Sequence, residues 1–85
     1  MNTNKTPPVA IVTAAGRGMG AAIARELHSR GYRLALMSPS GSAEALAKEL
    51  GAFGLSGSVA KPEDLQRLVD GAVKAFGRVD AVVNH

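Results

Sequence analysis

The chain of 85 residues contains no cysteine and no tryptophan, and aromatic residues make up only 4% of it. Without cysteine it can form neither disulfides nor thiolate metal sites, and His28 and His85 are not spaced like a pair of metal ligands. The shortage of aromatic side chains also argues against base stacking, although the net charge is +3. We therefore expect no metal and no nucleic-acid partner.

Long apolar runs are missing as well. No stretch approaches the roughly 20 residues that a membrane-spanning helix needs, and the polar segment 1–8 lacks the apolar core of a signal peptide. These absences predict a cytoplasmic protein with no membrane partner. Pro7 and Pro8 end the polar segment, so we interpret 1–8 as a disordered lead-in to a single small domain over residues 9–85.

Short apolar runs are present, and they predict four strands at 9–12, 34–37, 53–59 and 79–83, the third being the weakest. The first two runs are uniformly apolar, which is typical of parallel strands covered on both faces. Helical patterns fill the gaps, at 19–30, 43–50 and 62–76.

The residues that flank these helical patterns agree with them. A glycine follows each pattern, Pro62 suits a first helical position, and Ser42 is expected to cap the second helix. Met19 and Met37 are predicted to pack in the core, with Met19 also able to lie beside a ligand. Asp80 is interpreted as an ordinary surface charge.

The order β-α-β-α-β-α-β predicts an α/β protein with a Rossmann-like parallel sheet in strand order 3-2-1-4. This arrangement is an incomplete half of a doubly wound fold. Its first turn lies at the carboxyl edge of the sheet, where the strand order reverses and ligands bind.

That first turn is rich in glycine and leads directly into a helix. Gly16, Gly18 and Ala21 fit the dinucleotide fingerprint, because glycines let the backbone approach a pyrophosphate at the positive end of the helix. A phosphate-binding hydrolase would instead need lysine and serine or threonine after Gly20, where two alanines stand. The predicted phosphate site comprises Thr13, Ala15, Gly16, Arg17, Gly18, Met19 and Gly20.

A longer register of the same turn resembles the short-chain dehydrogenase/reductase family. The family's Thr-Gly-x-x-x-Gly-x-Gly falls on Thr13, Gly18 and Gly20, with Ala14 in place of the first glycine. We expect Ala14 to be tolerated if its φ stays negative. The family's Asn-Asn-Ala-Gly begins at Asn84, with His85 in its second place.

The resemblance implies a nicotinamide dinucleotide as ligand. The family's Asp-Val pair, whose carboxylate would contact the adenine amino group, falls on Ser58 and Val59. NAD specificity commonly rests on an acidic residue after the second strand, and Ser38 stands there. Ser40, two residues later, is a second hydroxyl that could donate to a phosphate. Because Arg17 could also bind a 2′-phosphate, NADP is preferred over NAD.

The resemblance further implies the amino-terminal, cofactor-binding portion of an oxidoreductase that transfers hydride between the nicotinamide and a carbonyl or alcohol substrate. The family's catalytic serine, tyrosine and lysine match no position here, so no catalytic residue is assigned and the chain alone is predicted to be inactive. Substrate binding and oligomers are expected only in a longer chain. The alternative is a stand-alone nucleotide-binding or interaction module from a truncated gene product.

Overall fold

Strands and helices alternate along the whole of the computed structural model, which describes residues 6–84. The four strands are β1 (Val9–Thr13), β2 (Arg33–Ser38), β3 (Phe53–Ser56) and β4 (Ala81–Val83). The three helices are α1 (Gly18–Ser29), α2 (Ser42–Leu50) and α3 (Pro62–Phe76). The predicted β-α-β-α-β-α-β order is confirmed.

The strands form one parallel sheet in the order β3-β2-β1-β4, as predicted. Ile11 in the central strand β1 pairs with Ala35 of β2 and with Val82 of β4. β1 is buried along its whole length, which explains its uniformly apolar sequence. The strand order reverses at β1, so the turn that follows this strand opens at the carboxyl edge of the sheet.

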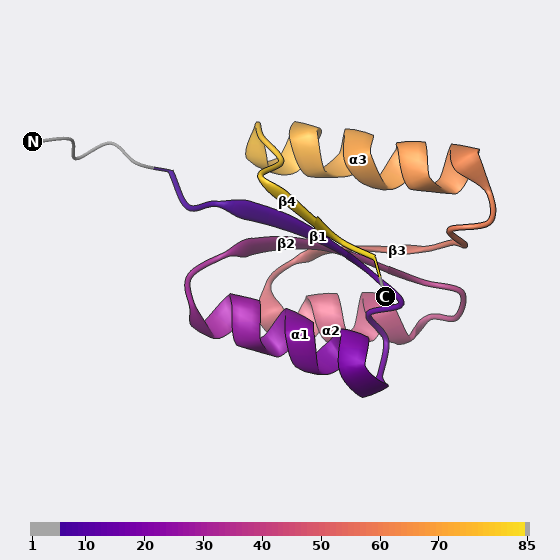
Figure 1. The fold of residues 1–85 in the computed structure, drawn as a ribbon, viewed down its shortest axis with the longest axis horizontal. Coiled ribbons are helices and arrows are strands. Elements are labelled where there is room, and N and C mark those ends of the chain that lie inside the picture. The colour runs from indigo at the N-terminus through magenta and orange to yellow at the C-terminus, as the bar shows by residue number, and fades with distance from the viewer. Residues whose placement is uncertain (1–5, 85) are drawn as a thin grey trace, which may run out of the picture.

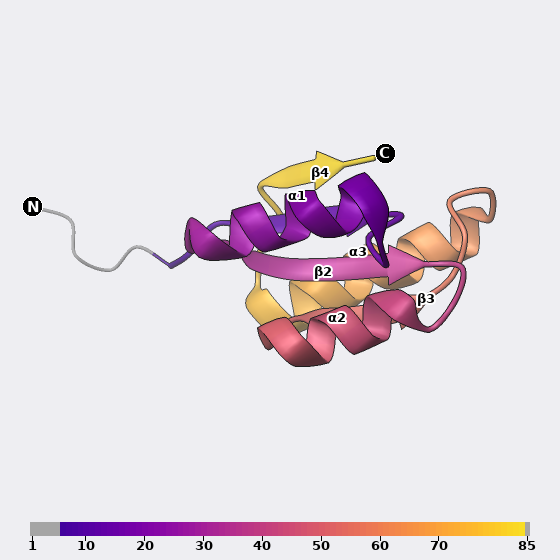
Figure 2. The ribbon, with the colours of Figure 1, turned by 90° about the horizontal axis from the view of Figure 1, so that it is seen from below.

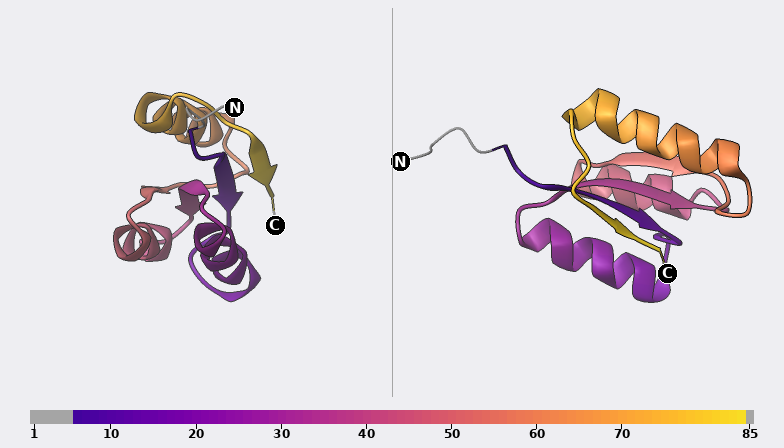
Figure 3. Two further views of the ribbon diagram at one scale, coloured as in Figure 1. Left: turned by 90° about the vertical axis from the view of Figure 1, so that its left-hand side faces the viewer. Right: turned by 45° about the horizontal axis from the view of Figure 1, so that its top comes forward.

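Helices cover both faces of the sheet. α1 and α2 lie side by side on one face and α3 lies on the other (Figures 1 and 2), and the end-on view in Figure 3 shows the three layers. Alternate residues along β1 and β2 supply the two cores. The core beneath α1 and α2 contains Ala10, Val12, Leu34, Leu36, Ala24, Leu46 and Ala47, and the core beneath α3 contains Val9, Ile11, Ala35, Met37, Leu68 and Ala72.

Several element boundaries differ from the sequence-based expectation. β3 ends at Ser56 rather than at residue 59, and the next residue, Gly57, already donates its N–H to the carbonyl oxygen of Ser38. β4 begins at Ala81 rather than at residue 79. α1 begins at Gly18, one residue early, and ends at Ser29.

The two methionines that were predicted to pack in the core have different environments. Met37 is buried in β2 as expected. Met19 is 61% exposed, so its assignment to the core was wrong. It stands in the first turn of α1.

The amino-terminal edge of the sheet is tied together by charged groups. The Asp80 carboxylate accepts hydrogen bonds from the backbone N–H of Val9 (2.8 Å) and from the guanidinium of Arg78 (2.7 and 2.9 Å). Arg78 lowers the pKa of Asp80, and the Val9 N–H adds to that effect. Asp80 therefore joins β1 to the start of β4, a role beyond the ordinary surface charge that was predicted.

Residues 6–8 precede the first strand and make contacts with the domain. The Arg33 N–H donates to the carbonyl oxygen of Pro8 at 2.8 Å, and the Arg78 guanidinium donates to the Thr6 hydroxyl. The remainder of the predicted lead-in, residues 1–5, and the predicted partial match at His85 lie outside the described residues. Within residues 6–84, no helix has the length and apolar character needed to cross a membrane.

Candidate functional site

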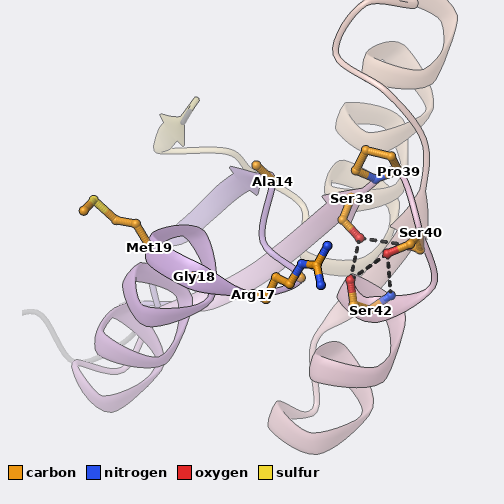
Figure 4. A pocket seen from close by; sticks show the side chains of 9 residues that line it. Ala14, Arg17, Gly18, Met19, Ser38, Pro39, Ser40 and Ser42 are labelled. Atoms are coloured by element: carbon orange, nitrogen blue, oxygen red, sulfur yellow. Dashed lines mark hydrogen bonds between the residues drawn. The ribbon is translucent and has the colours of Figure 1, made fainter.

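A cleft of ≈ 490 Å³ lies at the carboxyl edge of the sheet, between the start of α1 and the turn that joins β2 to α2 (Figure 4). Pockets that hold small molecules and cofactors usually measure about 300–1,000 Å³, so the cleft is of suitable size. Its walls are the glycine turn on one side and a serine-rich turn on the other. The lining residues are Ala14, Gly16, Arg17, Gly18, Met19, Ser38, Pro39, Ser40 and Ser42.

The glycine turn can adopt this shape only because three of its positions are glycines, which carry no side chain. A Cβ on Gly20 would overlap the carbonyl of Ala14, so the first turn of α1 is in direct contact with the first residue of the glycine turn. A Cβ on Gly16 would overlap the Ser42 hydroxyl, so this glycine lets the two walls of the cleft approach each other. Gly18 has a φ of +64°, which L residues rarely adopt.

Ala14 has a φ of +53°, so the condition under which we expected this alanine to be tolerated is not met. The fold imposes this conformation on the residue that replaces the family's first glycine. On one side Thr13 pairs with Met37 in the sheet, and on the other the Ala15 N–H donates to the Met37 carbonyl oxygen at 3.0 Å. Ala14 lies between these two fixed neighbours, and its exposed methyl group leaves room for the strained backbone.

The serine turn is organised by Ser38 at the end of β2, which is only 4% exposed. Its hydroxyl donates to the carbonyl oxygen of Ser40 at 2.8 Å and accepts the N–H of Ala43 at 3.0 Å. Gly41 is the N-cap of α2 and makes no side-chain cap hydrogen bond. The expected cap at Ser42 was therefore wrong, because the Ser38 hydroxyl binds the first turn of the helix instead.

Two further hydroxyl groups of this turn line the cleft. The Oγ atoms of Ser40 and Ser42 lie 2.8 Å apart and are hydrogen-bonded (Figure 4). Across the cleft, exposed Arg17 forms the N-cap of α1, and its guanidinium points toward the serine turn. The lining residues include this one cation and no carboxylate. The cleft thus offers a cation and hydroxyl donors, a combination that suits an anion.

Thr13 and Asn84 lie beside the cleft rather than in its lining. Buried Thr13 donates its hydroxyl proton to Oδ1 of Asn84 at 2.8 Å, which joins the carboxyl ends of β1 and β4. Both residues were predicted to contact a cofactor. The structure brings them together across the point where the strand order reverses.

Ser58 and Val59 are in the turn between β3 and α3 and do not line the cleft. The Ser58 N–H donates to the Asp64 carboxylate at 3.0 Å, and this bond, with help from Arg67, lowers the pKa of Asp64. The Ser58 hydroxyl accepts the Ala60 N–H at 3.1 Å and keeps its own proton for another acceptor. Val59 is 50% exposed.

The cleft therefore unites six of the residues predicted from sequence, namely Gly16, Arg17, Gly18, Met19, Ser38 and Ser40. Buried Ala15 and Gly20 lie next to its floor and support its shape. Sequence reasoning did not assign Ala14, Pro39 or Ser42 to the site. The two-residue spacing of Ser38, Ser40 and Ser42 around Pro39 is the signal that could have identified Ser42.

The residues of the cleft fit the diphosphate of a dinucleotide. The first N–H groups of a helix have no partner within the helix, and the start of α1 has no side-chain cap. Gly16 and Gly18 keep the turn beside these N–H groups free of side chains, so an anion can approach the backbone. The cradle that the glycines form is the observation on which this fit rests.

Comparison with known proteins agrees with this geometry. Residues 8–85 match the family model described as short chain dehydrogenase. The chain belongs to this family. The short chain dehydrogenase match spans the sheet, the three helices and the cleft.

Several curated relatives in the family are oxidoreductases. The chain is 35% identical over 83 residues to the 3-oxoacyl-(acyl-carrier-protein) reductase FabG of Staphylococcus epidermidis, covering 89% of this chain and 34% of the relative. It is 41% identical over 86 residues to an L-rhamnose 1-dehydrogenase (NAD(P)(+)) of Azotobacter vinelandii, covering 88% and 33%. The chain thus spans about a third of the length of these relatives.

Solved structures of the family share the fold and hold nicotinamide dinucleotides. A 3-ketoacyl-(acyl-carrier-protein) reductase from Brucella melitensis, complexed with NADH, superposes with a TM-score of 0.83 at 29% identity, covering 88% of this chain and 32% of that chain. A short chain dehydrogenase/reductase from Burkholderia phymatum, in complex with NAD, gives 0.83 at 33% identity, covering 89% and 29%.

Proposed function

We propose that this chain is the nicotinamide-dinucleotide-binding portion of an oxidoreductase and that it prefers NADP to NAD. The observation that carries the proposal is the cleft itself, in which a glycine-lined helix start with Arg17 at its N-cap faces serine hydroxyls without any carboxylate. Family membership and the NADH and NAD held by related structures support a nicotinamide dinucleotide as the ligand.

The cleft and the residues beside it would hold different parts of the ligand. Backbone N–H groups between Gly16 and Gly20 would bind the diphosphate, with the positive end of α1 behind them. Thr13 and Asn84, joined by their hydrogen bond, would keep the floor between β1 and β4 rigid. Ser58 and Val59 would serve the adenine end, where the Ser58 hydroxyl has a proton to donate.

The preference for NADP rests on the wall opposite the glycines. A carboxylate after β2 would accept the ribose 2′-hydroxyl and repel a 2′-phosphate, but Ser38 stands there. The Ser38 hydroxyl is already engaged within the turn, so Ser40 and Ser42 are the hydroxyls available to a phosphate. The Arg17 guanidinium would supply the positive charge.

When bound, the nicotinamide would accept or donate the hydride in a reaction with a carbonyl or alcohol. This chain would bind and orient the dinucleotide. The family's catalytic serine, tyrosine and lysine correspond to none of its residues, so we expect the 85-residue chain to show no turnover by itself. Substrate and oligomeric contacts would require a longer chain, and we propose a cytoplasmic location for it.

Titration of the chain with NADPH and NADH, followed by dinucleotide fluorescence, tests the proposal. We expect Arg17→Ala to weaken NADPH binding by about 10- to 100-fold and NADH binding much less, because charge-assisted hydrogen bonds to a phosphate contribute about 1.5–3 kcal/mol. Arg30→Ala at the far end of α1 is the control for net charge and should change neither affinity by more than about twofold. Equal losses of the two dinucleotides in Arg17→Ala would refute the NADP preference.

The alternative function is a stand-alone nucleotide-binding or interaction module without a reaction. The chain spans about a third of the length of its curated relatives. The two functions differ in what a longer native protein would do. Reductase turnover in a longer protein would support the first, and dinucleotide binding without turnover in the protein as isolated from its source would support the second.

A further inference from the structure

Ser56, at the end of β3, lies outside the cleft but touches the turn that forms its wall. Its Oγ is 2.9 Å from Oε1 of Glu44 and 3.2 Å from the carbonyl oxygen of Ser40. A hydroxyl has a single proton to donate, and the shorter distance is to the carboxylate. The Ser56 hydroxyl therefore binds a charged group of α2 and stays in contact with the serine turn.

Glu44 brings a negative charge close to the cleft. It stands in the first turn of α2, two residues after Ser42. Its Oε1 lies next to Gly41 of the serine turn, 3.8 Å from where a Cβ on that glycine would be. The positive end of the helix favours a carboxylate at this position. Glu44 is exposed and does not line the cleft, so its charge is near the wall but directed toward β3.

The serine turn is in contact with two strands. The carbonyl oxygen of Ser40 accepts the hydroxyl proton of Ser38 of β2, and the Ser56 hydroxyl of β3 lies 3.2 Å from the same oxygen while it donates to Glu44. With its carbonyl held in this way, Ser40 keeps its own hydroxyl on the cleft side, beside that of Ser42 (Figure 4). Loss of the Ser56 hydroxyl would remove the hydrogen bond that holds the Glu44 carboxylate and would release Glu44.

We infer that Ser56 is a positioning residue for dinucleotide preference, because it holds the Glu44 carboxylate away from the serine wall of the cleft. This inference rests on the proposed function. A released carboxylate could rotate toward the hydroxyls of Ser40 and Ser42, where it would accept their protons and repel a 2′-phosphate. NAD carries no phosphate there, so its binding would change little.

The test is a set of titrations with NADPH and NADH on the full chain and three variants. We expect Ser56→Ala to lower NADPH affinity about fivefold, the effect of one unit charge about 4 Å away when water fully screens it, and NADH affinity by less than about twofold. Ser56→Thr keeps the hydroxyl and should retain the original ratio of affinities. Glu44→Gln combined with Ser56→Ala removes the charge and should restore NADPH binding.

Three results separate the possibilities. Equal losses of NADPH and NADH in Ser56→Ala, or a NADPH loss that persists in the Glu44→Gln background, would overturn the role of Ser56 and leave the proposed function standing. Binding of neither dinucleotide to the unmodified chain would overturn both. If Ser56→Ala proves unfolded by circular dichroism, Ser56→Cys, whose thiol is a weak donor, replaces it with the same expected shift in the ratio.

Discussion

Replacing Ala14 by glycine should make the domain more stable, although the change removes a side chain. Ala14 has a φ of +53°, a region that costs an L residue about 1–2 kcal/mol. Glycine would remove that cost, but its greater freedom in the unfolded chain offsets about 0.4–1 kcal/mol of the gain. The Ala14 methyl is exposed, so little buried contact is lost. The net expectation is a stabilisation of about 0.5–1 kcal/mol.

The neighbouring alanine provides a matched control. Ala15 is fully buried, and its φ is not in the left-handed region. Ala15→Gly loses a buried methyl worth about 0.8 kcal/mol and also gains freedom in the unfolded chain, so it should destabilise by about 1–2 kcal/mol. The same substitution at adjacent positions should therefore change stability in opposite directions.

Urea unfolding followed by circular dichroism measures both variants, with the slope of the transition checked for each. In a domain of this size, 1 kcal/mol corresponds to about 4–8 °C in Tm, so thermal unfolding gives a second reading. A destabilised Ala14→Gly variant, or a shift in the same direction for both variants, would refute the argument that the fold holds Ala14 under strain.

Two other predictions concern the carboxyl and amino edges of the sheet. Gly20→Ala should destabilise by about 1–3 kcal/mol, since its methyl would overlap the Ala14 carbonyl, and wild-type urea midpoints for this variant would contradict the close contact. Arg78 and the Val9 N–H lower the pKa of Asp80, so stability from this carboxylate is present above its usual value of 3.8 and is lost as pH falls through the lowered value. Asp80→Asn should therefore be less stable at neutral pH and lose less stability on acidification, and parallel pH profiles for the two proteins would argue against this role.

Much of the fold was predictable because its signals are local. Apolar runs such as 9–12 can satisfy a strand buried on both faces, and glycines such as Gly51 and Gly77 end helices through a left-handed residue that the structure confirms. The alternation of strands and helices then leaves few topologies, since parallel strands require right-handed crossovers. Strand order and the location of the ligand edge follow from that rule.

The parts that were not predictable depend on contacts between distant segments. Met19 continues the apolar stripe of α1 in the sequence, but this side chain is 61% exposed and lines the cleft instead of the core. Ser42 has the sequence pattern of a helix cap, yet it is the buried Ser38 hydroxyl that accepts the N–H of Ala43 in the first turn of α2. Periodicity says which residues could face a core or cap a helix, and it does not say where neighbouring elements lie.

The sequence by itself determined the order of elements, the parallel sheet and the glycine turn that predicts a phosphate site, because backbone preference and apolar spacing act over a few residues. Tertiary structure alone decided the positive φ of Ala14, the hydrogen bond between Thr13 and Asn84 and the contact of Ser56 with Glu44 beside the hydrogen-bonded serines of the cleft wall. These features arise where β1, β2, β3 and β4 end side by side, and only the packing of the sheet brings those ends together.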